Sequence, residues 1–472
     1  MAESLKRGQE KKATMKGSLL ILLLSVVMLM YGIIGLSLDS KIPLLLCTLV
    51  MMFYGMHLKV SWNDMMKSAF KSISSSLEAM LIIMTIGMVI GSWVSGGTVP
   101  FVIYWGLKIF SPNAVLPFTV VICAIMSTLT GSSWTTAGTV GVAFLGIATS
   151  MGIPAPVTVG AICCGSFFGD AQSPMSDGFN FAVAISGSNL YKSVKELLCT
   201  TIPALLLSII IFAIIGAGYS SANVTASAQI ETTLSGLENA YNLNIFCLLP
   251  VVVMVIMMVR KAPAVATMLA AAAAGMIVTV FAQHHSLTDS FGYLVNGYVG
   301  NTGIADVDRI ITRGGVNGMM GTIALMFFSL WMAGVMQRIG MMDVILNHLA
   351  RIVTKLSPLT ALTTVVTFVM SYFAADPYLA MTLPAKSLDK AYDNLGLSRS
   401  ILCRSIANAV FFAPMVPWGS GGVYVTLTLG VATMQYIPYY FIGYLSPLFC
   451  ILFAMLNKFQ TKAEKAPETK TA

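Results

Sequence analysis

The chain has 472 residues, of which 57% are hydrophobic and 10% are charged, and its formal net charge is +8. A mean hydropathy of +0.83 excludes a soluble globular protein, because a fold of this size could not hide so much apolar surface from water. The basic excess is concentrated at the chain ends and implies no nucleic-acid partner.

Basic residues flank the apolar part of the chain. Residues 1–16 contain five lysines or arginines and residues 458–472 contain four lysines, whereas residues 219–242 contain neither. Positively charged segments next to membrane spans stay on the cytoplasmic side. The sequence therefore predicts a cytoplasmic N-terminal segment at 1–16, an external linker at 219–242 and a cytoplasmic tail at 458–472.

Long apolar runs fill most of the remaining sequence. About 20 apolar residues are needed to cross the hydrocarbon core of a bilayer as a helix. Together with the interrupted segments between them, these runs predict an all-α polytopic membrane protein in the lipid bilayer with about a dozen transmembrane segments. The runs are 17–36, 41–57, 77–95, 114–130, 197–218, 243–259, 262–282, 317–337, 358–374 and 436–457.

Two acidic residues stand beside prolines inside this lipid-like sequence. Asp170 precedes Ser173-Pro174, and Asp376 is followed directly by Pro377. An ionisable residue at bilayer depth costs at least about 2.5 kcal/mol, so it marks a functional site by default. A nearby proline breaks the helix and frees carbonyl groups that only a protein-lined cavity can satisfy. Both stretches therefore predict a cation site at a broken helix.

Oxygen-bearing side chains accompany each acid. In the first half, Ser133 and Thr135 lie in a stretch rich in glycine and hydroxyl groups, and Ser173, Asp177 and Asn180 follow Asp170. In the second half, Asp376 and Asn408 occupy the corresponding places. Hydroxyl and carbonyl oxygens suit a dehydrated alkali cation. Ser, Thr and Gly also permit ordinary close packing of membrane helices, which is the alternative reading.

The chain is predicted to be built twice. Residues 151–162 resemble 395–406 in layout at an offset of 244, and at an offset of 243 Ser133 aligns with Asp376. Secondary transporters commonly consist of inverted repeats whose broken or re-entrant helices meet at the bilayer midplane. The predicted repeats are 17–218 and 243–457. Low residue identity leaves open the alternative of two coincidentally similar hairpins.

Several motifs resemble the NhaC-type Na+/H+ antiporter family. They are Gly-Ser-Ser-Trp-Thr-Thr-Ala-Gly-Thr-Val-Gly-Val-Ala at 131–143, Phe-Gly-Asp-x-x-Ser-Pro-x-Ser-Asp at 168–177 with Asn180, Asp-x-Tyr-Leu-Ala at 376–380 and Pro-x-x-Pro-Trp at 414–418. The resemblance implies a bacterial inner-membrane antiporter that exchanges Na+ for H+. Some members of such families instead couple Na+ or H+ to organic acids or amino acids.

The resemblance also implies site residues. By position, Asp170, Ser173, Asp177 and Asn180 would line the ion path, with Asp376 as the counterpart in the second half. Asp170 and Asp376 are the candidate ligands of the transported Na+. Beyond Na+ and H+ themselves, no cofactor is expected, and the sequence is compatible with a homodimer.

This chain departs from the family pattern at three places. Ile406-Ala407 replaces an expected acidic pair, Gly178-Phe179 replaces two threonines, and Pro377 follows Asp376 in place of a polar residue. Arg404 also lies within an apolar segment, where a guanidinium requires a carboxylate partner. If the partner is a protein acid, simple Na+/H+ exchange stands. If the partner is a substrate, the protein transports a small carboxylate-bearing solute.

Other classes fit less well. A channel requires a ring of charged groups or carbonyls around a pore, and no filter-like repeat occurs in the sequence. A membrane protease requires a nucleophile or metal signature, which is also missing. The eight cysteines show no CxxC spacing and predict neither a disulfide framework nor a metal site. The sequence therefore predicts a transporter and not an enzyme.

Overall fold

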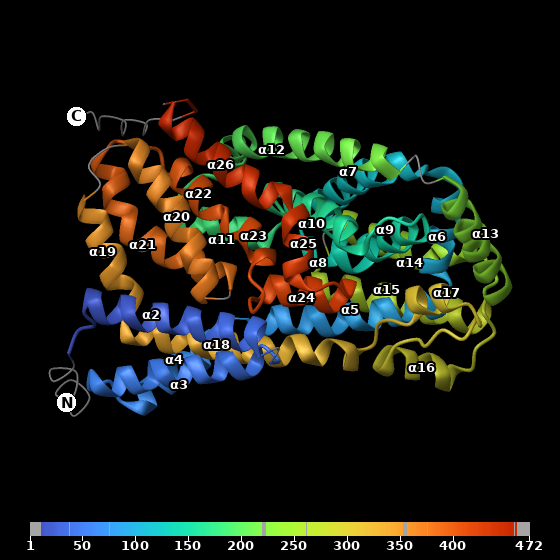
Figure 1. The fold of residues 1–472 in the computed structure, drawn as a ribbon, viewed down its shortest axis with the longest axis horizontal. Coiled ribbons are helices and arrows are strands. Elements are labelled where there is room, and N and C mark those ends of the chain that lie inside the picture. The colour runs from blue at the N-terminus through green and yellow to red at the C-terminus, as the bar shows by residue number, and fades with distance from the viewer. Residues whose placement is uncertain are drawn as a thin grey trace, which may run out of the picture.

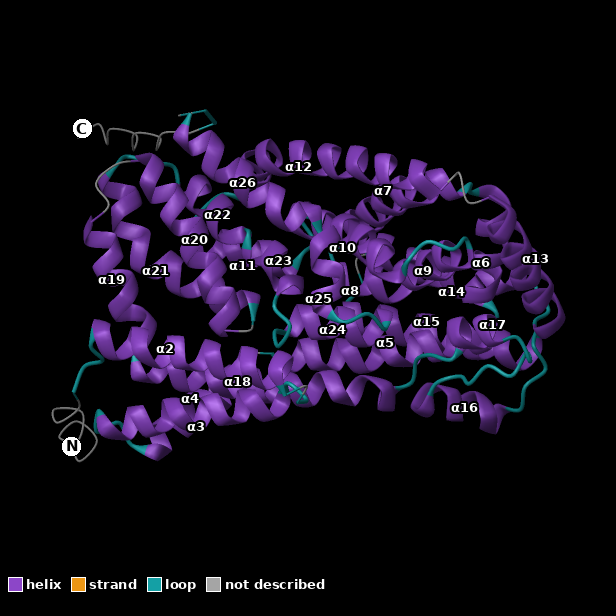
Figure 2. Cartoon of the chain, in the orientation of Figure 1, coloured by secondary structure: helices purple, strands orange, loops and turns teal. Residues whose placement is uncertain are grey.

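The protein is helical throughout the part of the chain that the structure describes (Figures 1 and 2). The computed structural model describes residues 11–459, apart from 37, 75, 220–222, 261, 353–355, 375 and 457. Within these residues the only β-type contact is an isolated bridge between Tyr298 and Arg313. Residues 1–10 and 460–472, which form most of the two predicted cytoplasmic ends, lie outside the described residues.

The first half of the chain runs from α2 to α12, and the five apolar runs predicted there fall on helices, although several further helices lie between them. The helices are α2 (Met15–Met30) with the π-helical turn η1 (Tyr31–Gly35), α3 (Lys41–His57), α4 (Trp62–Ser74), α5 (Leu77–Ser95), α6 (Thr98–Ile109), α7 (Pro112–Thr130), α8 (Ser133–Thr136), η2 (Ala137–Gly141), α9 (Val142–Ser150), α10 (Ala155–Gln172), α11 (Asp177–Ser186) and α12 (Leu190–Tyr219).

The second half follows one connecting helix, α13 (Asn223–Ala240), which occupies most of the predicted linker. It comprises η3 (Ile245–Leu248), α14 (Leu249–Val259), α15 (Ala264–Phe281), α16 (Leu287–Asn296), α17 (Ala305–Ile311), α18 (Val316–Ile339), α19 (Met341–Ile352), α20 (Leu356–Ala374), α21 (Pro377–Asn394), α22 (Arg399–Ala407), α23 (Ala409–Phe412), η4 (Ala413–Met415), α24 (Ser420–Leu429), α25 (Thr433–Tyr436), η5 (Ile437–Tyr439) and α26 (Phe441–Met455).

The described helices can cross a bilayer several times. Five of them are long and apolar enough to do so, and four pairs bent by more than 40° bring the number to nine if each pair is one span. The predicted run at 436–457 belongs to one of these bent pairs, with an angle of 54° between its pieces. The protein is thus a polytopic helical membrane protein, and the count of about a dozen crossings stays a prediction.

In the first half, the chain breaks twice near the centre of the molecule. Gly131 adopts a left-handed conformation (φ 68°) that ends α7, and the hydroxyl of Ser132 caps α8 by accepting from the backbone N–H of Thr135. The second break follows α10 at Ser173-Pro174, and the hydroxyl of Ser176 caps α11. Proline cannot continue a helix, which explains why α10 ends there.

The second half breaks at matching places. Asp376 caps α21 through a bond from the backbone N–H of Leu379, and α24 begins at Ser420 after the break that contains Pro417. The two capping residues, Ser132 and Asp376, lie 244 positions apart. Aligning the helix starts therefore pairs Asp376 with Ser132. The sequence offset of 243 indicated a pairing with Ser133, one residue further along the chain.

The two halves meet at these breaks. In Figure 1, α7 and α9 approach the centre from one end of the molecule, and α20 and α21 approach it from the other. Across the halves, α11 packs against α21, and α24 packs against η2. This order of elements agrees with a repeat, and it brings all four breaks to one region.

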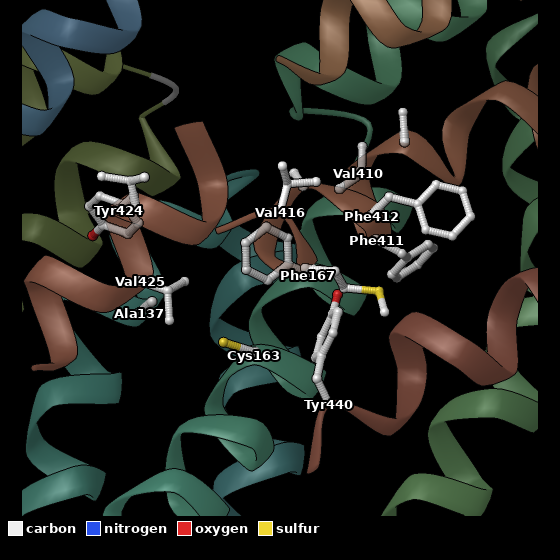
Figure 3. Packing of buried hydrophobic residues seen from close by; sticks show 14 of the residues in the cluster. Ala137, Cys163, Phe167, Val410, Phe411, Phe412, Val416, Tyr424, Val425 and Tyr440 are labelled. Atoms are coloured by element: carbon white, nitrogen blue, oxygen red, sulfur yellow. The ribbon is translucent and has the colours of Figure 1, made fainter. Parts of the chain in front are cut away.

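Aromatic side chains fill the core beside the breaks (Figure 3). Phe167 of α10, Phe411 of α23 and Tyr440 are buried there, and the rings of Phe167 and Tyr440 are 6.1 Å apart. Val425 of α24 lies beside Ala137 in the same view. Such packing fixes α10 against α23 and the start of α26, so the positions of the polar breaks are held by apolar contacts.

The segment of residues 297–315, which contains the short helix α17, packs directly on α5. The backbone N–H of Gly315 donates to the carbonyl of Gly87 over 2.7 Å. A Cβ atom at Gly87 would lie 2.5 Å from the backbone oxygen of Gly315, and one at Gly314 would lie 2.4 Å from the nitrogen of Gly91. Only glycine permits this approach, so the segment is joined to the helix backbone to backbone.

Candidate functional site

A central cavity of about 380 Å³ lies where the four helix breaks meet. Its walls come from both halves of the chain and from the first turns of α5 and α15. The polar residues among those that line it are Glu78, Thr130, Ser132, Ser133, Thr135, Asp170, Asp177, Thr267, Asp376, Tyr378 and Ser420.

Asp170 connects three of the segments around this cavity. Its Oδ2 accepts from the backbone N–H of Ser133 at 3.1 Å and from the Ser133 hydroxyl at 2.6 Å. Its Oδ1 accepts from the hydroxyl of Ser176 at 2.5 Å. Hydrogen bonds to a charged group are the strong ones, so three donors can satisfy a carboxylate that has left bulk water. The last turn of α10 is thereby joined to the starts of α8 and α11.

Two more aspartates face the same space from different helices. Asp376, at the start of α21, is 5% exposed, and its Oδ1 accepts from the backbone N–H of Leu379 at 3.1 Å. Asp177, in the first turn of α11, is exposed. The central cavity thus has one carboxylate held by hydroxyls, one held by a helix start, and one open to solvent.

The predicted residues divide into two groups. The structure brings Ser133, Thr135, Asp170, Asp177 and Asp376 together as walls of the central cavity. The hydroxyl of Thr135 lies 3.0 Å from that of Ser132, so this part of the wall is a continuous row of oxygen atoms.

Ser173 and Asn180 shape the break and do not line the cavity. The Ser173 hydroxyl accepts from the backbone N–H of Met175, and the Asn180 side chain donates to the carbonyl of Pro174 at 2.9 Å. Both bonds satisfy backbone groups that the break leaves open. Asn408 also lies elsewhere, where it donates to the carbonyl of Arg404 and accepts from the hydroxyl of Ser446.

Arg404 is fully buried and paired with a protein acid. Its Nη1 donates to Oε2 of Glu196 on α12 at 3.0 Å and to the backbone carbonyl of Phe459 at 2.8 Å. It is not among the residues that line the central cavity. Of the two partners considered for this guanidinium, the structure shows the protein carboxylate.

Glu78 and Ser176 are the notable residues that the sequence reading missed. Glu78 lines the cavity from the first turn of α5 and carries a fourth carboxylate. A charge at the start of the apolar run 77–95 was the available signal. Ser176 lies between the predicted residues Ser173 and Asp177, but its role depends on the turn at Pro174, which the sequence alone does not specify.

The described residues contain no group of three or more His, Cys, Asp or Glu side chains close enough to hold a metal ion. A bound Na+ would therefore combine one carboxylate with hydroxyl and carbonyl oxygens, which are the ligands that hard cations prefer. The row from Ser132 to Thr135 beside Asp170 provides such atoms. The site is suited to exchanging a small cation for a proton on a carboxylate.

Comparison with known proteins identifies the family. A model described as the Na+/H+ antiporter family matches residues 165–458, which is more than half of the chain. The chain belongs to the Na+/H+ antiporter family. The resemblance to its NhaC type is confirmed by the NhaC antiporter of Alkalihalophilus pseudofirmus, which is 34% identical over 450 residues, 95% of this chain and 97% of the relative.

Other relatives in this family are named for different solutes. The malate-2H+/Na+-lactate antiporter of Bacillus subtilis is 31% identical over 425 residues, 90% of this chain and 91% of the relative. The arginine/ornithine antiporter ArcD of Halobacterium salinarum is 31% identical over 469 residues, 97% of this chain and 96% of the relative. The family is one of transporters, and this chain covers the greater part of each relative.

Proposed function

We propose that the protein is a secondary antiporter that exchanges Na+ for H+ across the bacterial inner membrane, with both termini in the cytoplasm. The observation that carries the proposal is Asp170. A carboxylate at a helix break, bonded to Ser133 and Ser176 and facing a cavity lined by further oxygen atoms, can bind either a cation or a proton. The protein needs no cofactor for this exchange.

In this proposal, the two ions compete for Asp170. When Na+ binds the carboxylate together with the oxygen atoms around Ser132, the proton must leave, and a returning proton displaces Na+. Asp376 and Asp177 face the same cavity, so their charges influence the competition through space. Membership of the Na+/H+ antiporter family supports the same reading.

Asp170→Asn is the direct test. The amide keeps the size of the side chain and one acceptor oxygen but cannot take up a proton or carry charge. In proteoliposomes with a trapped pH-sensitive dye, a Na+ gradient should move protons through the wild type and not through Asp170→Asn. Asp39→Asn is the matched control, because Asp39 is exposed and pairs with Lys41 away from the cavity. Normal exchange in Asp170→Asn would disprove the assignment.

A second candidate function is Na+- or H+-coupled exchange of a small organic acid or amino acid. It is supported by the relatives named for malate, lactate, arginine and ornithine. The proteoliposome assay separates the two functions. A proton response to Na+ alone supports Na+/H+ exchange, and a response that requires an added solute supports the second function.

A further inference from the structure

A second cavity, of about 770 Å³, lies beyond the central one along α5 and α24. Its walls include the end of α9, part of α13, α17 and the segment that follows it, the start of α18 and the end of α24. The residues that line it and carry polar side chains are Thr149, Ser150, Thr233, Arg309, Thr312, Arg313, Thr428 and Gln435.

The two cavities share walls but are separated by a packed layer. On α5, Ile82 faces the central cavity and Ile90 faces the second one. Between them, the rings of Trp134 and Tyr424 stack at 5.0 Å, and the Tyr424 hydroxyl donates to the carbonyl of Trp134 at 2.6 Å. On α5, about two turns of helix, or roughly 12 Å, lie between Ile82 of the central cavity and Ile90 of the second one.

The second cavity is positively charged. Arg309 and Arg313 both line it, and none of the described residues in its wall is acidic. The carboxylate of the neighbouring Asp308 already accepts from the backbone N–H and hydroxyl of Thr302. Burial and the nearby Arg309 guanidinium lower the pKa of Arg313 to about 10, so the two cations repel each other at close range.

Three buried donors in this cavity lack a hydrogen-bond partner. They are Nη1 of Arg313, the hydroxyl of Ser150 and the hydroxyl of Thr428. A buried polar atom without a partner costs about 1–3 kcal/mol, and more if it is charged. These atoms belong to three separate parts of the cavity wall and are themselves covered by protein. Unpaired polar groups in the wall, together with two guanidinium groups that line the cavity, favour a ligand that carries negative oxygen atoms.

We propose that the second cavity binds a small carboxylate, with Arg309 and Arg313 as its charged contacts. A guanidinium pairs with carboxylate oxygens through two parallel hydrogen bonds. Because two guanidinium groups line the same cavity, a dicarboxylate can pair one carboxylate with each of them, which a compact phosphate does less well. This binding goes beyond Na+/H+ exchange, which requires no anion site.

The test measures anion binding directly. Titration calorimetry on the purified full-length protein in detergent, in a Na+-free buffer, uses L-malate as the probe and inorganic phosphate as the competing oxyanion. L-malate should bind the wild type, and Arg313→Gln and Arg309→Gln should each weaken its binding about tenfold or more. Arg260→Gln removes the same charge at an exposed position outside the cavity and should keep wild-type affinity.

Three results would overturn the proposal. They are no binding of L-malate by the wild type, equal affinity in Arg313→Gln and Arg309→Gln, and phosphate binding as tight as that of malate. If Arg313→Gln fails to fold, Arg313→Lys provides a milder variant, which keeps the charge but loses the two parallel hydrogen bonds and should still weaken malate binding. Because the assay contains no Na+ and measures no transport, a negative result leaves the Na+/H+ proposal untouched, and loss of exchange in Asp170→Asn leaves this one untouched.

Discussion

Arg404→Met should destabilise the protein substantially while leaving its ion selectivity unchanged. The Arg404 side chain is fully buried and that of Glu196 is 10% exposed. The substitution therefore leaves the Glu196 carboxylate of α12 without its guanidinium partner. Removing one member of a buried ion pair costs about 3–5 kcal/mol. Only Nη1 is engaged, since Nε and Nη2 have no partner, so we expect the lower end of that range.

The double variant Arg404→Met/Glu196→Gln provides the matched comparison. A neutral glutamine removes the carboxylate charge that faced the guanidinium, so the double variant should be more stable than Arg404→Met alone. Arg338→Met is the control for loss of an arginine, because Arg338 pairs with Asp64 at 3.4 Å near the surface, where such pairs contribute about 0–1 kcal/mol.

Unfolding of the purified protein by SDS, followed through tryptophan fluorescence, measures these differences. The reasoning is refuted if Arg404→Met unfolds within about 1 kcal/mol of the wild type, which is the range of the surface control. It is also refuted if Arg404→Lys keeps full stability but loses a solute-dependent transport signal, because the arginine would then bind a substrate.

Two further predictions concern the central cavity and the segment on α5. Asp376→Asn should keep the cap of α21, since Asn and Asp cap helices about equally well, and should shift the pH profile of exchange; an unchanged profile in proteoliposomes contradicts a shared electrostatic field with Asp170. Gly91→Ala should lower thermal stability because its Cβ would lie 2.3 Å from a backbone oxygen, whereas Gly292→Ala, with nothing within 4 Å, should raise stability by up to about 1 kcal/mol; equal melting temperatures for the two variants contradict the close contact.

Much of the fold was predictable because lipid imposes simple rules. The helices α5, α7 and α12 contain the predicted runs at 77–95, 114–130 and 197–218, since uninterrupted apolar sequence has no other stable form in a bilayer. The breaks after α10 and α20 were indicated by Pro174 and Pro377, which cannot continue a helix. Short amphipathic helices such as α4 and α19 were not predicted, because their mixed sequence lacks a long apolar run.

The central site was predictable in part. Asp170, Asp376 and Ser133 stand out as polar groups in apolar sequence, and they do line one cavity. Asn408 and Arg404 carry the same signal but are bonded elsewhere in the protein, Asn408 to the backbone carbonyl of Arg404 and Arg404 to Glu196. Sequence spacing cannot separate these cases, because it does not say which face of a helix meets a cavity.

The cationic cavity was not predictable at all. Arg309 and Arg313 occur in a polar connecting segment, where positive charges usually face water. Their significance comes from the packing of residues 297–315 on α5, which places them against the ends of α9 and α24. No local pattern in the sequence reports that contact.

Residues 297–315 contact α5 through a seam of glycines, whereas Arg309 and Arg313 of the same segment line the second cavity. Gly87, Gly91, Gly314 and Gly315 make the contact with α5 through main-chain atoms, so this contact does not depend on the identity of the charged side chains in the segment. Residues such as Arg309 can therefore be exchanged without refitting the helix underneath. A segment grafted at this seam from a relative with another solute should dock in the same pose, so the seam is a natural place to redesign what the second cavity accepts.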